Sequence, residues 1–242
     1  NNIDYSQNAE FRIAFGRVLN ELKSFDKAII EFQRAIEINN SIIAQYFIAL
    51  TYFLQANYYD SANQFMKIKD SYSIEQLGTE LYELIEDYMF RSLLFSNNTE
   101  EILNRTEKWH KSQCRSIEGS ARARAIKNNG ESINDAEKRI EQLIRSLTIL
   151  EDVVKHDGYV KCACIQIQNI ANEIAMLLLK ESFKSQKSSI NLINFIIKHV
   201  PQTTEQVGYE NSEYFLRFVE YYNTSNSIDI QNPFKKPYWT DF

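Results

Sequence analysis

The sequence predicts an all-α protein, and three observations support that fold class. Only 6 of the 242 residues are Gly and 3 are Pro, too few for a fold rich in strands and tight turns. Apolar residues recur at helical steps of three and four along most of the chain. An aromatic residue, an acid, a spacer and an alanine recur 34 positions apart, at residues 25–28 and 59–62. A fixed period of this length is typical of a solenoid built from helix pairs.

The first half of the chain is expected to hold two helix pairs. Residues 11–22 carry the first apolar stripe, a turn follows, and residues 28–36 carry the second stripe. The pair recurs with stripes over residues 46–53 and 62–68. Small side chains let two helices approach closely, so we expect burial at helix crossings for Ala28 and Ala62.

Longer helical stripes follow in the second half, where the 34-residue pattern weakens. They cover residues 74–88, 133–154, 160–178, 190–200 and 214–221. Helix N-terminal caps are expected at Thr99 and at the pair Ser132 and Asp135. Gly130 is expected to close a helix in the left-handed conformation.

Residues 9–70 resemble the tetratricopeptide repeat (TPR) family. That motif has small residues at its eighth, twentieth and twenty-seventh positions and an aromatic residue at its twenty-fourth. In the first unit the matching residues are Gly16, Ala28, Phe32 and Ala35. In the second unit Tyr59 and Ala62 match, whereas the residues that depart are Leu50, Met66 and Lys69. The resemblance implies a right-handed α-solenoid of antiparallel helix pairs, TPR-like at first and with longer, divergent helices in the second half.

Three segments are expected along the chain. TPR-like repeats are expected over residues 1–73, and divergent helical repeats continuous with them over residues 74–222. Residues 223–242 lack a helical period but hold four large aromatic residues, Phe234, Tyr238, Trp239 and Phe242. We expect this tail to fold back and cover the apolar end of the solenoid. The alternatives are an exposed docking motif for another chain and a junction to further sequence.

The resemblance implies that the protein binds a peptide or a partner helix in the concave groove lined by the first helix of each pair. The groove-facing residues would be Ile13, Arg17, Asn20, Glu21, Phe47, Thr51, Leu54 and Gln55. The TPR subclass that grips the C-terminal carboxylate of chaperone tails needs Lys and Asn where this chain has Ile13 and Arg17, and Asn where it has Ile48. The mixed lining therefore favours an internal peptide or a helix. Alternatively, Ile13, Phe47 and Leu54 pack beneath a neighbouring segment.

Charge is distributed unevenly between two neighbouring stretches. The formal net charge is −5 and the pI about 5.4, which gives no global attraction to nucleic acid. Residues 74–102 are mainly acidic, whereas residues 103–127 contain the basic residues Arg105, Lys108, Lys111, Arg115, Arg122, Arg124 and Lys127. These basic residues either lie on a solvated face attracted to the acidic one or bind an acidic peptide or a nucleic-acid backbone. A nucleic-acid-associated helical protein is therefore the alternative to a peptide-binding module.

The sequence contains no motif for a catalytic or metal centre. It has no glycine-rich phosphate loop, no H-E-x-x-H and no C-x-x-C. Cys162 and Cys164 lie two positions apart and point to nearly opposite faces of a helix, so they cannot easily share a metal. The histidines are expected to be exposed or to cap helix ends, at positions His110, His156 and His199. No catalytic residue, cofactor or metal is expected, and an all-α enzyme is a third interpretation without a supporting constellation.

An odd set of 3 cysteines argues against a disulfide framework and for a reducing compartment. No signal peptide is visible, and no apolar run reaches the roughly 18 residues that a membrane span needs. The leading interpretation is a cytoplasmic protein–protein interaction module without a membrane partner, forming the scaffold or sensor part of a larger regulatory protein. The sequence leaves the partner and the oligomeric state open.

Overall fold

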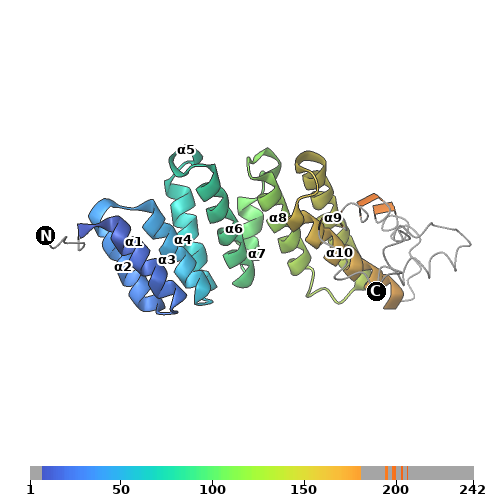
Figure 1. Ribbon diagram of the computed structural model, residues 1–242. Helices are drawn as coiled ribbons and strands as arrows, with labels where there is room; N and C mark the ends of the chain where they lie inside the picture. The colour runs from blue at the N-terminus through green and yellow to red at the C-terminus, as the bar shows by residue number, and fades with distance from the viewer. Residues whose placement is uncertain (1–6, 181–193, 196–197, 200–202, 204–205, 207–242) are drawn as a thin grey trace, which may run out of the picture. The chain divides into compact units, whose positions relative to one another are not determined.

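The computed structural model of the protein describes residues 7–180, 194–195, 198–199, 203 and 206, and these residues are arranged as helices and connecting turns without a β-strand (Figure 1). The prediction of an all-α protein is therefore confirmed. The chain packs as two units, residues 1–102 and residues 103–242. The predicted helix over residues 214–221 and the predicted tail over residues 223–242 lie outside the described residues.

The first unit contains six helices and the start of a seventh. They are α1 (Ala9–Glu21), α2 (Phe25–Asn39), α3 (Ile42–Leu54), α4 (Tyr58–Ser71), the short α5 (Ile74–Leu77), α6 (Thr79–Phe95) and the first residues of α7 (Thr99–Arg105). Tight turns make α2 run back along α1, and α4 back along α3 (Figure 1). Alternate helices also touch, because α3 packs against both α1 and α6.

One turn geometry occurs three times in the first unit. The residues Lys23, Ala56 and Asn97 each take a left-handed backbone, with φ of 56°, 59° and 57°. At the first turn the amide of Ser24 donates to the carbonyl of Leu19 at 2.8 Å. The same bond joins Asn57 to Tyr52 and Asn98 to Leu93. This is the Schellman arrangement, which satisfies carbonyl groups that a helix end would otherwise leave unbonded.

The helices recur 33 positions apart, one fewer than the sequence pattern suggested. Helices begin at Ala9 and Ile42, and their antiparallel neighbours begin at Phe25 and Tyr58. The buried equivalents of Gly16, Ala28 and Phe32 are therefore Ala49, Ser61 and Phe65. The sequence alignment of the second pair was displaced by one residue, which is why Leu50 and Met66 looked like departures. Ala28 and Ala62 are nonetheless both buried, as predicted.

Aromatic rings and polar side chains join neighbouring helices in the first unit. Phe32 is fully buried, and a Cβ at Gly16 would lie 2.5 Å from its ring, so only glycine fits there. The Phe32 ring stacks on Phe47 with centroids 5.4 Å apart, and Phe65 stacks on Tyr88 at 5.9 Å. Buried polar bridges also join α1 to α3, at Asn20–Thr51, and α4 to α6, at Ser61–Ser92 and Lys69–Glu86.

The second unit is built on longer helices with an aliphatic core. After the end of α7 come the 3-10 turn η2 (Trp109–Lys111), α8 (Arg115–Asn129), α9 (Ala136–Asp157) and α10 (Lys161–Lys180). The last two are 22 and 20 residues long, against 13 to 15 for α1 to α4. Leucine, isoleucine, valine and alanine side chains from α8, α9 and α10 form the core, with Trp109 at its edge. A Cβ at Gly119 would collide with Val153 and Trp109, so this α8 glycine permits the crossing with α9.

Two details of the helix ends differ from expectation. Asp135 does cap α9, since its side chain accepts from the amide of Lys138, but the side chain that caps α7 is Asn98 and not Thr99. Gly130 closes α8 with φ −80°, so the predicted left-handed conformation is wrong. Its carbonyl accepts from Ile133, and the Arg139 guanidinium occupies the space of a Cβ, so close approach explains this glycine.

Candidate functional site

The predicted groove residues lie on α1 and α3, which the structure brings side by side. The guanidinium of Arg17 lies over the Phe47 ring, 5.4 Å from its centroid. Ile13 and Phe47 are half-buried against the apolar core of the first unit. Arg17 and Glu21 on α1 are exposed, and so is Leu54 on α3. These three residues form the solvent-accessible part of the predicted lining.

Two of the predicted lining residues are buried partners of each other. The Asn20 amide donates to the Thr51 hydroxyl at 2.8 Å, and that hydroxyl donates in turn to the carbonyl of Phe47 at 2.7 Å. Asn20 is 9 % exposed and Thr51 is 0 % exposed. Because both groups are satisfied inside the protein, they fix the register of α1 against α3 and are not presented to a ligand. Gln55 is half-buried and donates to Asp26 at 3.3 Å.

The predicted basic residues do not all reach the surface. Arg122 donates to the carbonyl of Leu103 at 2.9 Å, and Arg115 to that of His110 at 2.8 Å. Lys127 pairs with Glu131 and Glu173. These three residues are half-buried, and so is Arg105, whereas the exposed members of the set are Lys108, Lys111 and Arg124. Several of the predicted cations therefore stabilise the second unit itself.

A polar pocket of about 490 Å³ lies between α8 and α10. Its lining consists mainly of charged and carboxamide side chains, with two isoleucines: Arg124, Lys127, Asn128, Glu131, Ile165, Gln166, Asn169, Ile170 and Glu173. Glu173 accepts from Arg139 at 3.0 Å and from Lys127 at 3.1 Å. The cations and carboxylates of this pocket largely neutralise one another, while its carboxamides can both donate and accept hydrogen bonds.

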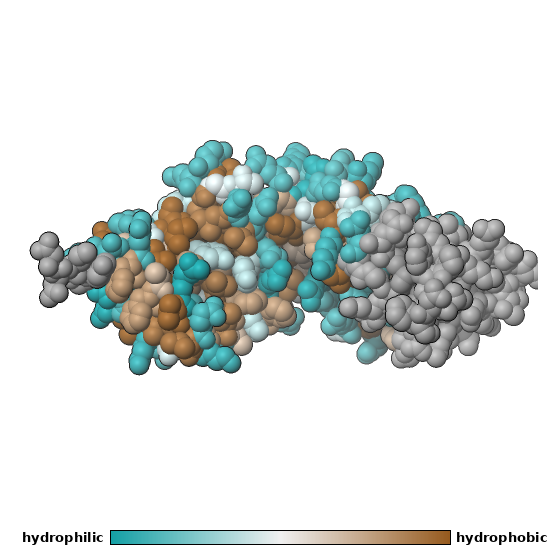
Figure 2. Space-filling view, in the orientation of Figure 1, coloured by the Kyte–Doolittle hydropathy of each residue, from teal (hydrophilic) through white to brown (hydrophobic). Residues whose placement is uncertain are grey.

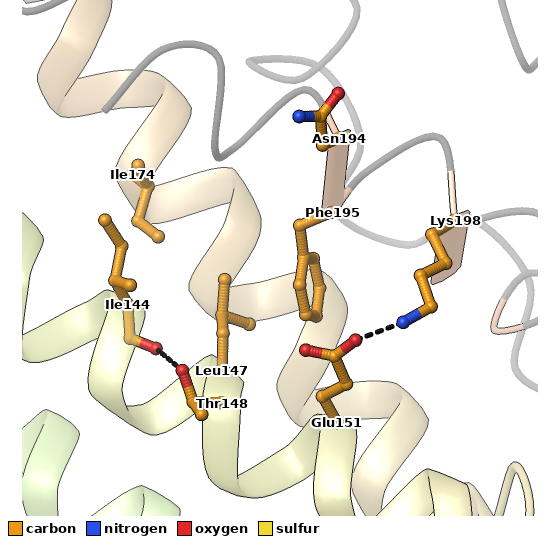
Figure 3. Close-up of a pocket in the computed structure, with 8 residues that line it drawn as sticks. All are labelled: Ile144, Leu147, Thr148, Glu151, Ile174, Asn194, Phe195 and Lys198. Atoms are coloured by element: carbon orange, nitrogen blue, oxygen red, sulfur yellow. Dashed lines mark hydrogen bonds and ion pairs between the residues drawn. The ribbon is translucent and has the colours of Figure 1, made fainter. Parts of the chain in front are cut away.

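A second cleft, of about 410 Å³, is lined by residues of α9 and α10 together with Asn194, Phe195 and Lys198 (Figure 3). Figure 3 shows the Phe195 ring pointing toward Glu151 of α9, with Leu147 on one side and Lys198 on the other. The ammonium group of Lys198 pairs with the Glu151 carboxylate. Next to this cleft lies a further one of about 570 Å³, whose lining includes Tyr159 and His199.

His199 connects a carboxylate to a phenol. Its Nε2 lies 3.3 Å from the Glu151 carboxylate and its Nδ1 lies 3.0 Å from the Tyr159 hydroxyl. Burial lowers the pKa of His199 below 6.5, and the hydrogen bond from Lys198 lowers the pKa of Glu151 below 4.5. An ionised carboxylate only accepts, so Nε2–H of the neutral imidazole donates to Glu151, and Nδ1 accepts from Tyr159.

The chemistry of this cluster suits a structural contact that holds His199 against α9 better than it suits catalysis. Burial raises the pKa of Tyr159, which keeps its hydroxyl protonated and a poor nucleophile. His199 is 3 % exposed, so of the two predicted alternatives, an exposed histidine or one that caps a helix end, exposure does not hold for this residue. The cluster was not visible in the sequence, because Glu151 and Tyr159 lie 48 and 40 positions from His199.

In comparisons with known proteins, no family model matches the chain and no curated protein matches it. Among the described residues, no group of three or more His, Cys, Asp or Glu side chains is placed to hold a metal ion. None of the described helices combines the length and the apolar character needed to cross a bilayer.

Proposed function

We propose that this protein is a non-enzymatic interaction module of the TPR type, in which helix pairs stack as a right-handed α-solenoid. The observation that supports it best is the recurrence at 33 positions in α1 to α4 of helix starts, left-handed turn residues and buried small and aromatic side chains. A third turn of the same geometry follows α6. Such recurrence is expected when each helix pair buries its apolar face against the next.

The proposed ligand is an extended peptide or a partner helix held across α1 and α3. Arg17 and Glu21 offer opposite charges, and Leu54 is an apolar residue that is 51 % exposed. A ligand that places an apolar side chain on Leu54 and charged groups near Arg17 and Glu21 fits this combination. The module would serve as a scaffold or sensor in the cytoplasm, an environment that suits a chain with an odd set of 3 cysteines.

The test begins with peptides selected from a random display library on the whole chain. Binding of the selected peptides is then measured by isothermal titration calorimetry. Arg17→Glu and Leu54→Asp are each expected to weaken binding about tenfold or more, as at an interface hot spot. The matched controls are Lys27→Glu and Ile30→Asp, which make the same changes at exposed positions of α2 and should leave affinity unchanged. Peptides that bind all four variants equally would refute the proposal.

Nucleic-acid binding remains the second proposal, supported by the exposed cations Lys108, Lys111 and Arg124. The geometry favours it less than peptide binding, because Arg115, Arg122 and Lys127 already donate to groups of the protein. If it holds, affinity for a single- or double-stranded probe should fall steeply with salt as counterions are released. Absence of binding to either probe at low salt would exclude it.

A further inference from the structure

Helices α8 and α10 of the second unit flank a polar pocket, and two contacts show how these helices are aligned. Figure 2 shows hydrophobic side chains gathered on the face of the first unit that it presents, whereas this pocket of about 490 Å³ is lined mainly by polar groups. The Ser120 hydroxyl lies 3.6 Å from the Cys162 sulfur, and the Lys127 ammonium lies 3.1 Å from the Glu173 carboxylate. Both residues of the second contact follow those of the first, so α8 and α10 run parallel, and the pocket residues between the two contacts face one another.

Arg124 of α8 is a lining cation whose charge is not balanced by a carboxylate. Lys127 pairs with Glu131 and Glu173. Arg139 pairs with Glu173 as well, so these two cations face two carboxylates. Arg124 is exposed and pairs with no carboxylate among the described residues. A ligand with a single negative charge would balance it, whereas a phosphate monoester, with about two negative charges at neutral pH, would bring an excess charge close to Glu131 and Glu173.

Two carboxamides of the pocket offer hydrogen bonds to a ligand. Gln166 lies on α10, between the same two helix contacts as Arg124, and its side-chain oxygen is buried without a donor among the described residues. A buried acceptor without a donor costs free energy. The last torsion of a glutamine side chain is broad, so a small rotation turns this oxygen into the pocket, where an N–H of a ligand would supply the missing donor. Asn128 on the α8 wall has an N–H that suits a ligand carbonyl.

We propose that the pocket between α8 and α10 binds a small monocarboxylate that carries an amide group, the chemistry of an N-acylated amino acid. Arg124 binds the carboxylate, Gln166 accepts from the amide N–H, and Asn128 donates to the amide carbonyl. Ile165, which is 42 % exposed, offers apolar surface to a hydrocarbon side chain of the ligand. The volume of about 490 Å³ is typical of a small-molecule site. The site lies in the second unit and does not depend on the peptide surface proposed for α1 and α3.

The experiment titrates the whole chain with a panel of N-acetyl amino acids that have hydrocarbon side chains. The readout is the shift of the Asn128 and Gln166 carboxamide signals in two-dimensional 1H–15N NMR spectra, which gives a dissociation constant for each compound. The acids should bind about tenfold more tightly than their methyl esters, which lack the charge. They should also bind about tenfold more tightly than aliphatic carboxylates of equal size, which lack the amide. Inorganic phosphate should bind more weakly than the acids.

Two substitutions test the assigned roles, each with a matched control. Arg124→Gln should weaken the acids about tenfold and make acid and ester bind equally. Arg145→Gln makes the same change at an exposed position of α9 outside the pocket and should leave affinity unchanged. Gln166→Met keeps the length of the side chain and should remove the preference for compounds with an amide. Gln33→Met, at an exposed position of α2, should not.

Three results would overturn the proposal. The first is the absence of a saturable shift with every member of the panel. The second is equal affinity of acids and esters for the parent protein, or equal losses in Arg124→Gln and Arg145→Gln, because the charge would then be read without a specific partner. The third is tighter binding of inorganic phosphate than of the acids, which would assign Arg124 to phosphate recognition.

Discussion

The two units of this protein hold their helices together by different means. In the first unit, helices α1 to α4 are short, and stacked rings and buried polar pairs join each to its neighbours. In the second unit, the two long helices α9 and α10 share an aliphatic core, and the charged contacts centre on Glu173, which is 21 % exposed and pairs with Arg139 and Lys127. Buried polar pairs specify which helix faces can meet, whereas aliphatic cores tolerate more variation.

This difference predicts which substitutions should destabilise each unit most. A short helix buries little surface, so its register depends on a few specific contacts. Loss of one such contact leaves a polar group buried without a partner, which costs more than the contact itself contributes. We therefore expect the first unit to be more sensitive to changes in polar side chains, and both units to be equally sensitive at close helix crossings.

The largest effect is expected from Glu86. Its side chain is 0 % exposed and pairs with Lys69, whose ammonium also lies over the rings of Tyr82 and Phe90. Glu86→Gln should lower the free energy of unfolding by about 3 kcal/mol, because the Lys69 charge loses its partner. Glu173→Gln in the second unit should cost only about 1.5 kcal/mol, since Glu173 is 21 % exposed.

Urea denaturation followed by circular dichroism measures both variants. As a control, the double change Lys69→Met, Glu86→Leu should restore much of the loss, because an apolar pair needs no countercharge. Equal losses for Glu86→Gln and Glu173→Gln would remove the contrast between the two units.

Overpacking at a helix crossing should affect the two units alike. Ala28 in α2 and Ala123 in α8 are both 0 % exposed. Replacing either with Leu should destabilise the protein by about 1–3 kcal/mol, because the added carbons displace a neighbouring helix. Thermal denaturation is the measurement. If Ala28→Leu were as stable as the parent, the crossing would have been placed on the wrong residue.

A smaller effect is expected from the Asn20–Thr51 bridge between α1 and α3. Asn20→Ala and Thr51→Val, measured separately and together, form a double-mutant cycle. Their coupling energy should be about 1 kcal/mol, the usual net value of a neutral hydrogen bond. In the second unit, the Ser146 hydroxyl donates to the carbonyl of Ala123 at 2.9 Å. The loss of stability in Ser146→Ala, measured alone, is the value with which the first unit is compared. A coupling energy near zero would mean that the bridge does not hold the two helices in register.

The smallest expected effect is a loss of stability on acidification. It should appear only in the second unit, which contains all three histidines of the sequence. The lowered pKa of His199 means that the neutral imidazole is the form that stays bound to Glu151 and Tyr159. This contribution is fully present above pH 6.5 and is lost as the pH falls through the lower pKa of the folded protein. The lowered pKa of Glu151 adds a loss of the same sign below pH 4.5.

Histidine NMR titration should therefore show release of residues 198–199 from α9 on acidification. His199→Gln should remove the pH dependence of stability that comes from titration of this histidine. His156 is an exposed histidine on α9, and His156→Gln should leave that pH dependence unchanged. A His199 resonance that titrates at the unperturbed pKa would contradict the predicted direction.

Residues close together in the sequence were predicted better than residues far apart. Apolar periodicity predicted the helices of the first unit, and Ala28 and Phe32 were correctly assigned as a buried small residue and a matching aromatic. The second pair was misaligned by one residue because both Ser61 and Ala62 are small and buried. Tyr59 was taken as the repeat of Phe25, yet Tyr59 is 66 % exposed, and Tyr58 packs against Phe53 and Phe95.

The candidate sites were harder to predict, since they depend on the direction of individual side chains. Arg122 belongs to a basic stretch, but its position on α8 turns it toward the carbonyl of Leu103. Asn20 and Thr51 have the spacing of groove residues, but their side chains form a buried hydrogen bond with each other and do not line the groove. The bond between His199 and Glu151 joins residues 48 positions apart, and no local pattern encodes such a contact.

The left-handed turns have a consequence for redesigning this chain. The three turn residues are a lysine, an alanine and an asparagine, so the backbone shape does not depend on one kind of side chain. The first two turns lie 33 positions apart and the next lies 41 positions on, and α5 occupies the longer connection. The connection between helix pairs therefore differs in length along the chain, while the turn within a pair has the same geometry each time.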